Sequence, residues 1–140
     1  MKSLGRVLLI VILTCLIGLG LYVRYAPTDP ERWHRMPDSV ADRDLDYGAM
    51  RVVPGDERDL RRLHRIILDT PRTRVMAGAP EERMITYVTR SAVFRFPDYT
   101  TVRHRHARIE IFGRLRFGTS DLGVNAARID GWLETFAERR

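Results

Sequence analysis

The feature that most constrains this chain is an uncharged apolar run from Val7 to Val23, bracketed by Arg6 and Arg24. A membrane-spanning helix needs ~20 mostly apolar residues, because each helical residue rises by only about 1.5 Å. The run reaches that length when the apolar residues beside it, out to Tyr25, are included. We therefore expect residues 1–25 to form a short cytoplasmic start and a transmembrane helix.

Three kinds of segment contain such a run. A cleaved signal peptide needs small residues at its cleavage site, and the sequence RYAP after the run fits poorly. A lipoprotein would be acylated at Cys15, which instead lies inside the run. The pattern favours an uncleaved single-pass anchor. Lys2 and Arg6 precede it, so the positive-inside rule predicts a cytoplasmic (inner) membrane protein with its domain on the outer, periplasmic side, although Arg24 opposes this.

Residue counts exclude several chemistries. Cys15 is the only cysteine, so the part after the span has no disulfide and no thiol nucleophile. Lys2 is the only lysine, which excludes Schiff-base and Ser-Lys mechanisms there. The net charge is +6, and 23 of the 24 basic residues are arginine. Such a ratio resembles a coding bias more than selection for nucleic acid, which the anchor also disfavours. A basic domain suits a surface of anionic lipid.

After the span, residues 26–46 contain three prolines and no sustained apolar period, which predicts an extended tether. Trp33 in this segment has two interpretations, a ring at the headgroup level or a cap on the edge of the domain core. Residues 47–140 then read as one small domain.

That domain alternates strand and helix patterns. We expect a strand at 50–53, a helix capped by Asp56 that ends by Asp69-Thr70, and strands at 73–77, 83–96, 99–104 and 108–117. A closing helix carries Ile129, Trp132 and Phe136 on one face. The order β-α-β-β-β-β-α predicts an α+β fold, with an antiparallel sheet and both helices on one face.

Strand 108–117 shows the cleanest alternation. Ile109 and Ile111 fall on one face and the arginines on the other, with Phe112 as the exception. Gly113, on the apolar face, predicts a bulge or a close approach of another element. The arginine-rich face is either a platform for an anionic lipid or an acidic partner, or a solvated surface of ion pairs. Its members are Arg90, Arg103, Arg108, Arg114 and Arg116.

Catalytic motifs are scarce. The sequence has no phosphate-binding glycine loop, no zinc-protease helix and no G-x-S-x-G elbow. His104 and His106 are spaced like two ligands on a strand, but neighbouring arginines would repel a cation, so we expect no metal and no cofactor. Acids paired with arginine, such as Asp98, should stay ionised, which suits a structural role better than general-acid catalysis.

The segment SDLGVNAARI, residues 120–129, precedes the closing helix. Asn125 is a favoured N-cap, with Val124 and Ile129 at the spacing of a hydrophobic staple. An earlier start capped by Ser120 or Asp121 is the alternative. We expect Arg114 or Arg128 to reach Asp121. The segment is then either a structural polar corner or a ligand site.

Several stretches carry a family resemblance: TPRTRVMAG, ITYVTRSAVFRFPDYTTV and IEIFGRLRFGTSDLGVNAARIDGWL. Together with the single span and the APTDPERWH tether, they resemble the bacterial domain-of-unknown-function family 1499. The resemblance implies a membrane-anchored envelope protein, and because the family has no assigned activity, it gives no catalytic role to carry over to this chain. It also selects the polar residues Arg90, Asp98, Arg114, Ser120, Asp121, Asn125 and Arg128.

The first functional hypothesis is a non-enzymatic module that binds a lipid, an anion or a protein. The second is an enzyme that uses Asp121, Asn125 and neighbouring arginines.

Overall fold

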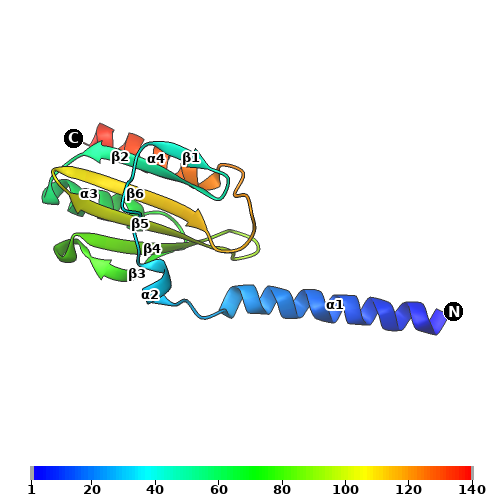
Figure 1. Cartoon of the computed structure of the whole chain (residues 1–140). Coiled ribbons are helices and arrows are strands. Elements are labelled where there is room, and N and C mark those ends of the chain that lie inside the picture. Colours follow the sequence, from blue (N-terminus) through cyan, green and yellow to red (C-terminus); the bar gives the residue numbers. More distant parts are fainter. Residues whose placement is uncertain (1, 140) are drawn as a thin grey trace.

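A long helix projects from a compact domain in the computed structural model, which describes residues 2–139 (Figure 1). The elements in chain order are α1 (Lys2–Tyr25), α2 (Pro30–Trp33), β1 (Arg43–Leu45), β2 (Gly48–Pro54), α3 (Glu57–Leu68), β3 (Thr73–Ala79), the 3₁₀ turn η1 (Pro80–Glu82), β4 (Met84–Arg90), β5 (Pro97–Arg105), β6 (Arg108–Leu115) and α4 (Val124–Glu138).

Six antiparallel strands form one sheet, in the order β1-β2-β6-β5-β4-β3. Strands β3 to β6 follow one another as a meander, and β2 pairs with the remaining edge of β6. Helices α3 and α4 contact each other behind the strands (Figure 1). The predicted α+β class, its element order and the placement of both helices on one face are therefore confirmed. The short edge strand β1 is an addition to the prediction.

The main hydrophobic core lies between the sheet and the two helices. Its largest buried members are Leu60, Leu63, Ile66 and Ile67 from α3, Ile129, Trp132 and Phe136 from α4, and Ile85, Tyr87, Val102, Ile109 and Ile111 from the sheet. Full burial of one such side chain contributes ~1.5–3 kcal/mol. Helix α3 begins as predicted, because the Asp56 carboxylate accepts hydrogen bonds from the N–H groups of Arg58 and Asp59 in a capping box.

Residues 26–42, which we call the strap, run across the other face of the sheet in front of the strands (Figure 1). Residues 26–46 were expected to form an extended tether, but residues 43–45 form β1, and the strap contains α2 and packs Val40 against Met50 and Phe112 of the sheet in a smaller apolar cluster. The ring of Trp33 stacks on Tyr99, with 4.3 Å between the ring centroids. Trp33 thus caps the edge of the domain core. The exception noted at Phe112 is explained, because the strap gives that side chain an apolar neighbour.

Strand β4 is shorter than predicted. The pattern favoured a strand from 83 to 96, but β4 ends at Arg90 and residues 91–96 form a loop. The Ser91 N–H donates to the Phe96 carbonyl at 2.9 Å, which closes the loop, and Arg95 adopts a positive φ of 61°. The apolar residues at the end of the predicted strand, Val93, Phe94 and Phe96, are consequently exposed.

Helix α1 is long and apolar enough to cross a membrane by length and composition, with a mean hydropathy of 2.5 over its most apolar window. An N-terminal signal sequence has the same properties. The last turn of α1 contacts the domain, because the side chain of Val23 is only 5% exposed and the ring of Tyr22 lies 6.2 Å from that of Phe117. The helix therefore meets the domain beside the connection that follows β6.

Candidate functional site

Polar residues cluster around the connection between β6 and α4. We call this group the polar corner, and its members are Asp98, Ser120, Asp121, Asn125 and Arg128. Its centre is the Asp121 carboxylate. One oxygen accepts the Gly123 N–H at 3.0 Å, and the other accepts the backbone N–H and the side-chain amide of Asn125 at 2.9 and 2.8 Å. Asp121 thus supplies the acceptor that the first turn of α4 needs.

The predicted N-cap at Asn125 is wrong. Helix α4 begins at Val124, and Asn125 lies inside its first turn with a fully buried side chain. Leu122 and Gly123 both have positive φ, 53° and 79°, and this tight turn folds the Asp121 carboxylate back over the helix start. The alternative, an earlier start with Ser120 or Asp121 as the N-cap residue, is not adopted either: the N-cap position is Gly123, and the Asp121 carboxylate accepts N–H groups from two residues further back. Ser120 contributes little, since its hydroxyl accepts only the Leu122 N–H at 3.3 Å on the surface.

Arg128 extends the polar corner to the sheet. Its guanidinium donates to the Asn125 side-chain oxygen at 3.0 Å and to Asp98 at 3.1 Å. The expected contact of an arginine with Asp121 is therefore replaced by an indirect one through Asn125. Burial raises the pKa of Asp98 above its usual value, and the positive charge of Arg128 opposes that effect. Asp98, Asn125, Asp121 and Arg128 form one connected chain of hydrogen bonds.

The arginines of β5 and β6 mostly make contacts inside the domain. Arg103 and Arg108 both pair with the fully buried Glu110, at 2.6 and 3.0 Å. Arg103 also donates to the Pro37 carbonyl of the strap. Arg108 stays about half exposed. The pair Arg103–Glu110 is the kind of cross-strand ion pair expected of a solvated face, whereas Arg108 and Glu110 lie on the same strand, and the acid that both arginines share is buried.

Arg114 is 7% exposed and holds the strap on the sheet. Its guanidinium donates to the carbonyl oxygens of Trp33, Arg35 and Phe112 and to the Thr101 hydroxyl. Burial lowers its pKa to about 10. Within residues 2–139 no carboxylate pairs with it. Carbonyl dipoles therefore compensate a buried charge, which is costly unless hydrogen-bonded.

Arg116 binds the chain that leaves α1. Its guanidinium donates to the Pro27 carbonyl at 2.8 Å and to the Tyr99 hydroxyl at 3.1 Å, with a longer contact to the Ala26 carbonyl. The connection between α1 and the sheet is consequently fixed at its first residues.

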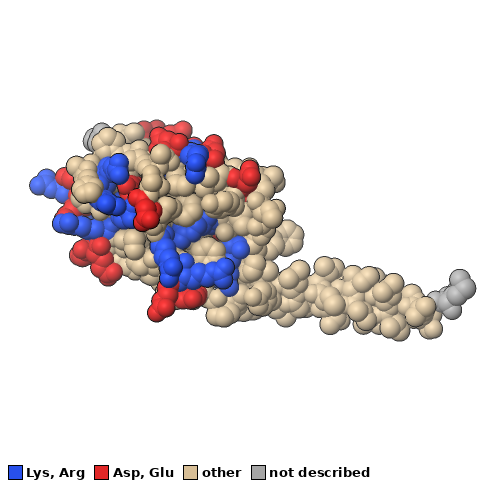
Figure 2. Space-filling view, viewed as in Figure 1, with Lys and Arg blue, Asp and Glu red and all other residues tan. Residues whose placement is uncertain are grey.

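Four arginines surround the point where α1 joins the domain: Arg24, Arg74, Arg90 and Arg116. We call them the junction arginines. Three of them, Arg24, Arg74 and Arg90, line a hollow of about 430 Å³ between the end of α1 and the sheet edge. Figure 2 shows a band of basic side chains on this part of the domain, near the base of the helix. Across residues 2–139, no ion pair joins any of the four to an acid.

The junction arginines lie close enough to repel one another electrostatically. The pKa of Arg90 is lowered, first by burial and then by the positive charges of Arg74, Arg116 and Arg24. An anion placed among them would relieve that repulsion. Sequence analysis named Arg90 and Arg116 but missed Arg24 and Arg74. The missed signal was register, because Arg74 pairs with Val88 and so shares a face with Arg90, two residues on.

Other chemistry finds little support at these positions. His104 lies beside the β5–β6 turn and His106 within it, and no group of three His, Cys, Asp or Glu side chains in the described chain is placed to hold a metal ion. The polar corner brings Asp98 and Asp121 near each other, but an amide and a guanidinium lie between them.

Comparison with known proteins gives one result. Neither the curated proteins nor the solved structures contain a significant match to this chain. The profile of one family, described as "Protein of unknown function (DUF1499)", matches residues 23–136. The match begins in the last turn of α1 and ends in α4, so it includes the strap and the whole sheet. The chain belongs to the DUF1499 family.

Proposed function

We propose that this protein is a single-pass inner-membrane protein whose periplasmic domain binds the headgroups of anionic lipids, as a non-enzymatic accessory module of the bacterial envelope. The observation that carries the proposal is the group of junction arginines. Three of them line the hollow beside the end of the apolar helix, the fourth binds the chain that follows it, and none has a carboxylate partner in the described residues. If α1 spans the membrane, this is the level at which lipid phosphates lie.

The energetics suit a lipid surface. One basic residue near an anionic membrane contributes ~1 kcal/mol, so four contribute at most about 4 kcal/mol. Such an increment would be weak for a soluble ligand, but it suffices for a domain that the anchor already holds at the surface. The anchor would hold the domain at the lipid surface, and the arginines would add headgroup binding there. A nucleic-acid partner stays disfavoured.

The enzyme hypothesis at Asp121, Asn125 and Arg128 has less support. The Asp121 carboxylate already accepts three hydrogen bonds and the Asn125 amide is fully buried. A nucleophile or general base needs a free, reachable atom. The contacts of the polar corner favour a structural role.

Native mass spectrometry of the full-length protein tests the lipid proposal. The protein in neutral detergent is mixed with equal amounts of phosphatidylglycerol and phosphatidylethanolamine. We expect adducts mainly of phosphatidylglycerol. The double variant Arg74→Gln/Arg90→Gln should bind it roughly 25-fold more weakly, at ~1 kcal/mol for each arginine.

The matched control is Arg61→Gln/Arg65→Gln, which removes the same charge from exposed positions on α3. This control should bind phosphatidylglycerol like the wild type. Equal weakening in both double variants, or equal binding of the two lipids by the wild type, would contradict the proposal.

A further inference from the structure

The loop between β4 and β5 exposes three large apolar side chains in a row of four residues. Val93 is 78% exposed, Phe94 71% and Phe96 42%. The two phenylalanine rings lie side by side, with 5.8 Å between their centroids. Isolated exposed apolar residues are ordinary, but a contiguous exposed group of this kind marks an interaction site.

The loop is built to present these side chains. The Ser91 N–H donates to the Phe96 carbonyl at 2.9 Å, and the Phe96 N–H donates back to the Ser91 hydroxyl at 3.0 Å. The Arg90 guanidinium donates to the Arg95 carbonyl at 3.0 Å. The loop is thus closed at its base and braced by a junction arginine, while Val93 and Phe94 remain largely exposed.

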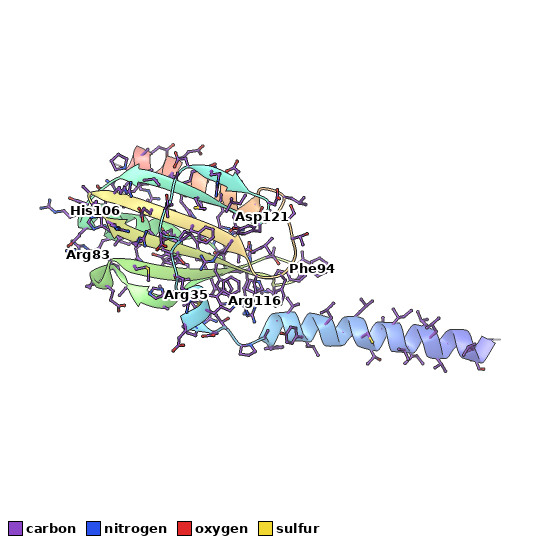
Figure 3. The ribbon with its side chains drawn as sticks, viewed as in Figure 1. Arg35, Arg83, Phe94, His106, Arg116 and Asp121 are labelled. Atoms are coloured by element: carbon purple, nitrogen blue, oxygen red, sulfur yellow. The ribbon has the colours of Figure 1, made fainter. Side chains whose placement is uncertain are left out.

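Its position follows from strand register. In the meander, the end of β4 and the start of β5 lie at the same sheet end as the last residues of β6, since Arg90 pairs with Pro97 and Asp98 with Leu115. Arg116, directly after β6, binds the chain that leaves α1. Figure 3 accordingly shows Phe94 at the end of the domain toward which α1 extends, with Arg83 at the opposite end.

We propose that the loop 91–96 inserts Val93 and Phe94 into the headgroup and acyl boundary of the membrane that α1 crosses. This inference rests on the proposed membrane anchoring and specifies a second contact with the same bilayer. Two features select lipid as the occupant: continuity with the end of the apolar helix, and the junction arginines beside the loop, whose charge matches anionic headgroups. Aromatic side chains are enriched at this depth of a bilayer.

Site-directed spin labelling of the full-length chain tests the insertion. The substitution Cys15→Ser first removes the only cysteine. A single new cysteine is then introduced by Phe94→Cys or, in a separate protein, by Glu82→Cys, and a nitroxide is attached to it. Glu82 is exposed in η1, next to Arg83, far from the loop. The labelled proteins are placed in vesicles of phosphatidylethanolamine and phosphatidylglycerol, and collision with oxygen is compared with collision with a water-soluble nickel complex.

We expect the label at 94 to collide more with oxygen than with nickel, and the label at 82 to show the reverse. Val93→Cys should repeat the result at 94. Both positions are exposed, so each labelled chain should melt like its parent. Nickel accessibility at 94 equal to that at 82 would overturn the insertion, as would low accessibility to both reagents, which indicates cover by protein.

Failure here is distinguishable from failure of the proposed function. A water-exposed loop in a protein that still binds phosphatidylglycerol through Arg74 and Arg90 would refute only the insertion. Insertion of the loop in a wild-type protein that binds the two lipids equally, or whose phosphatidylglycerol binding is unchanged in Arg74→Gln/Arg90→Gln, would support the loop and contradict the headgroup site.

Discussion

Replacement of Asp121 by asparagine is the most direct test of what the polar corner does. The change keeps the size of the side chain but turns one acceptor oxygen into a donor. In the wild type, one oxygen faces the Gly123 N–H and the other faces two donors of Asn125. An asparagine can orient its oxygen toward only one of these sides. We expect it to keep the pair of bonds from Asn125 and to leave the Gly123 N–H without its acceptor.

The expected cost follows from these bonds. Loss of the hydrogen bond from the Gly123 N–H costs ~1 kcal/mol, and the two remaining bonds weaken because their acceptor is no longer charged. We expect a total of about 1–2 kcal/mol. For a domain of this size, one kcal/mol shifts the melting temperature by roughly 4–8 °C, so Asp121→Asn should melt about 5–10 °C lower.

The melting temperature of the full-length protein in detergent is measured by near-ultraviolet circular dichroism, which reports the packing of the buried Trp132. Ser120→Ala is the matched control, because its hydroxyl accepts one long surface bond. It should melt within about 2 °C of the wild type. If Asp121→Asn melts like the wild type yet fails to restore function in cells lacking the gene, the structural role is refuted and a ligand site is favoured.

Two further substitutions probe the core. Burial lowers the pKa of His64, whose ring contacts the Tyr87 hydroxyl at 2.8 Å. The folded state thus resists a protonation that the unfolded chain accepts: its stability should be intact above pH 6.5 and fall as the pH drops through the lowered pKa. Melting curves between about pH 7.5 and about pH 5 should show a shallower decline for His64→Gln, and an identical decline would exclude His64 as a cause. Gly113→Ala places a methyl group 2.8 Å from the Ile129 side chain and 3.1 Å from that of Asn125. This overpacking should cost about 1–3 kcal/mol in thermal melts, and an unchanged melting temperature would mean that α4 does not approach β6 so closely.

Much of the fold follows from local patterns. The period of two in β6 correctly separates Ile109 and Ile111 from Arg114, and Asp56 begins α3 as its spacing predicts. Gly113 was expected at a close approach, and α4 supplies that neighbour. These features rest on interactions within one element or between adjacent elements, which the sequence encodes directly.

The strap could not be predicted in the same way. Arg114 donates to the backbone carbonyl oxygens of Trp33 and Arg35. Because every residue has a backbone carbonyl, the amino-acid types in the strap do not indicate this contact. The prediction of where α4 begins was wrong for a different reason. Asp121 and Asn125 are both good capping residues, but the N-cap position falls on Gly123, where a turn with positive φ at Leu122 and Gly123 precedes the helix. Val93, Phe94 and Phe96 suggested a strand, because sequence alone does not distinguish apolar side chains that are buried in a sheet from apolar side chains that are exposed in a loop.

Because arginines hold the strap on the sheet, the strap does not act as a flexible linker between α1 and the domain. A flexible linker of the strap's length would let the domain wander roughly 20–25 Å from the membrane. Here Arg116 and Arg114 secure the chain from its first residues onward, and the family match includes the segment. If α1 spans the bilayer as we propose, the distance between bilayer and domain is therefore set by the fold. A protein of this design would then sample only a thin layer above the lipid, and any binding partner must come to that layer.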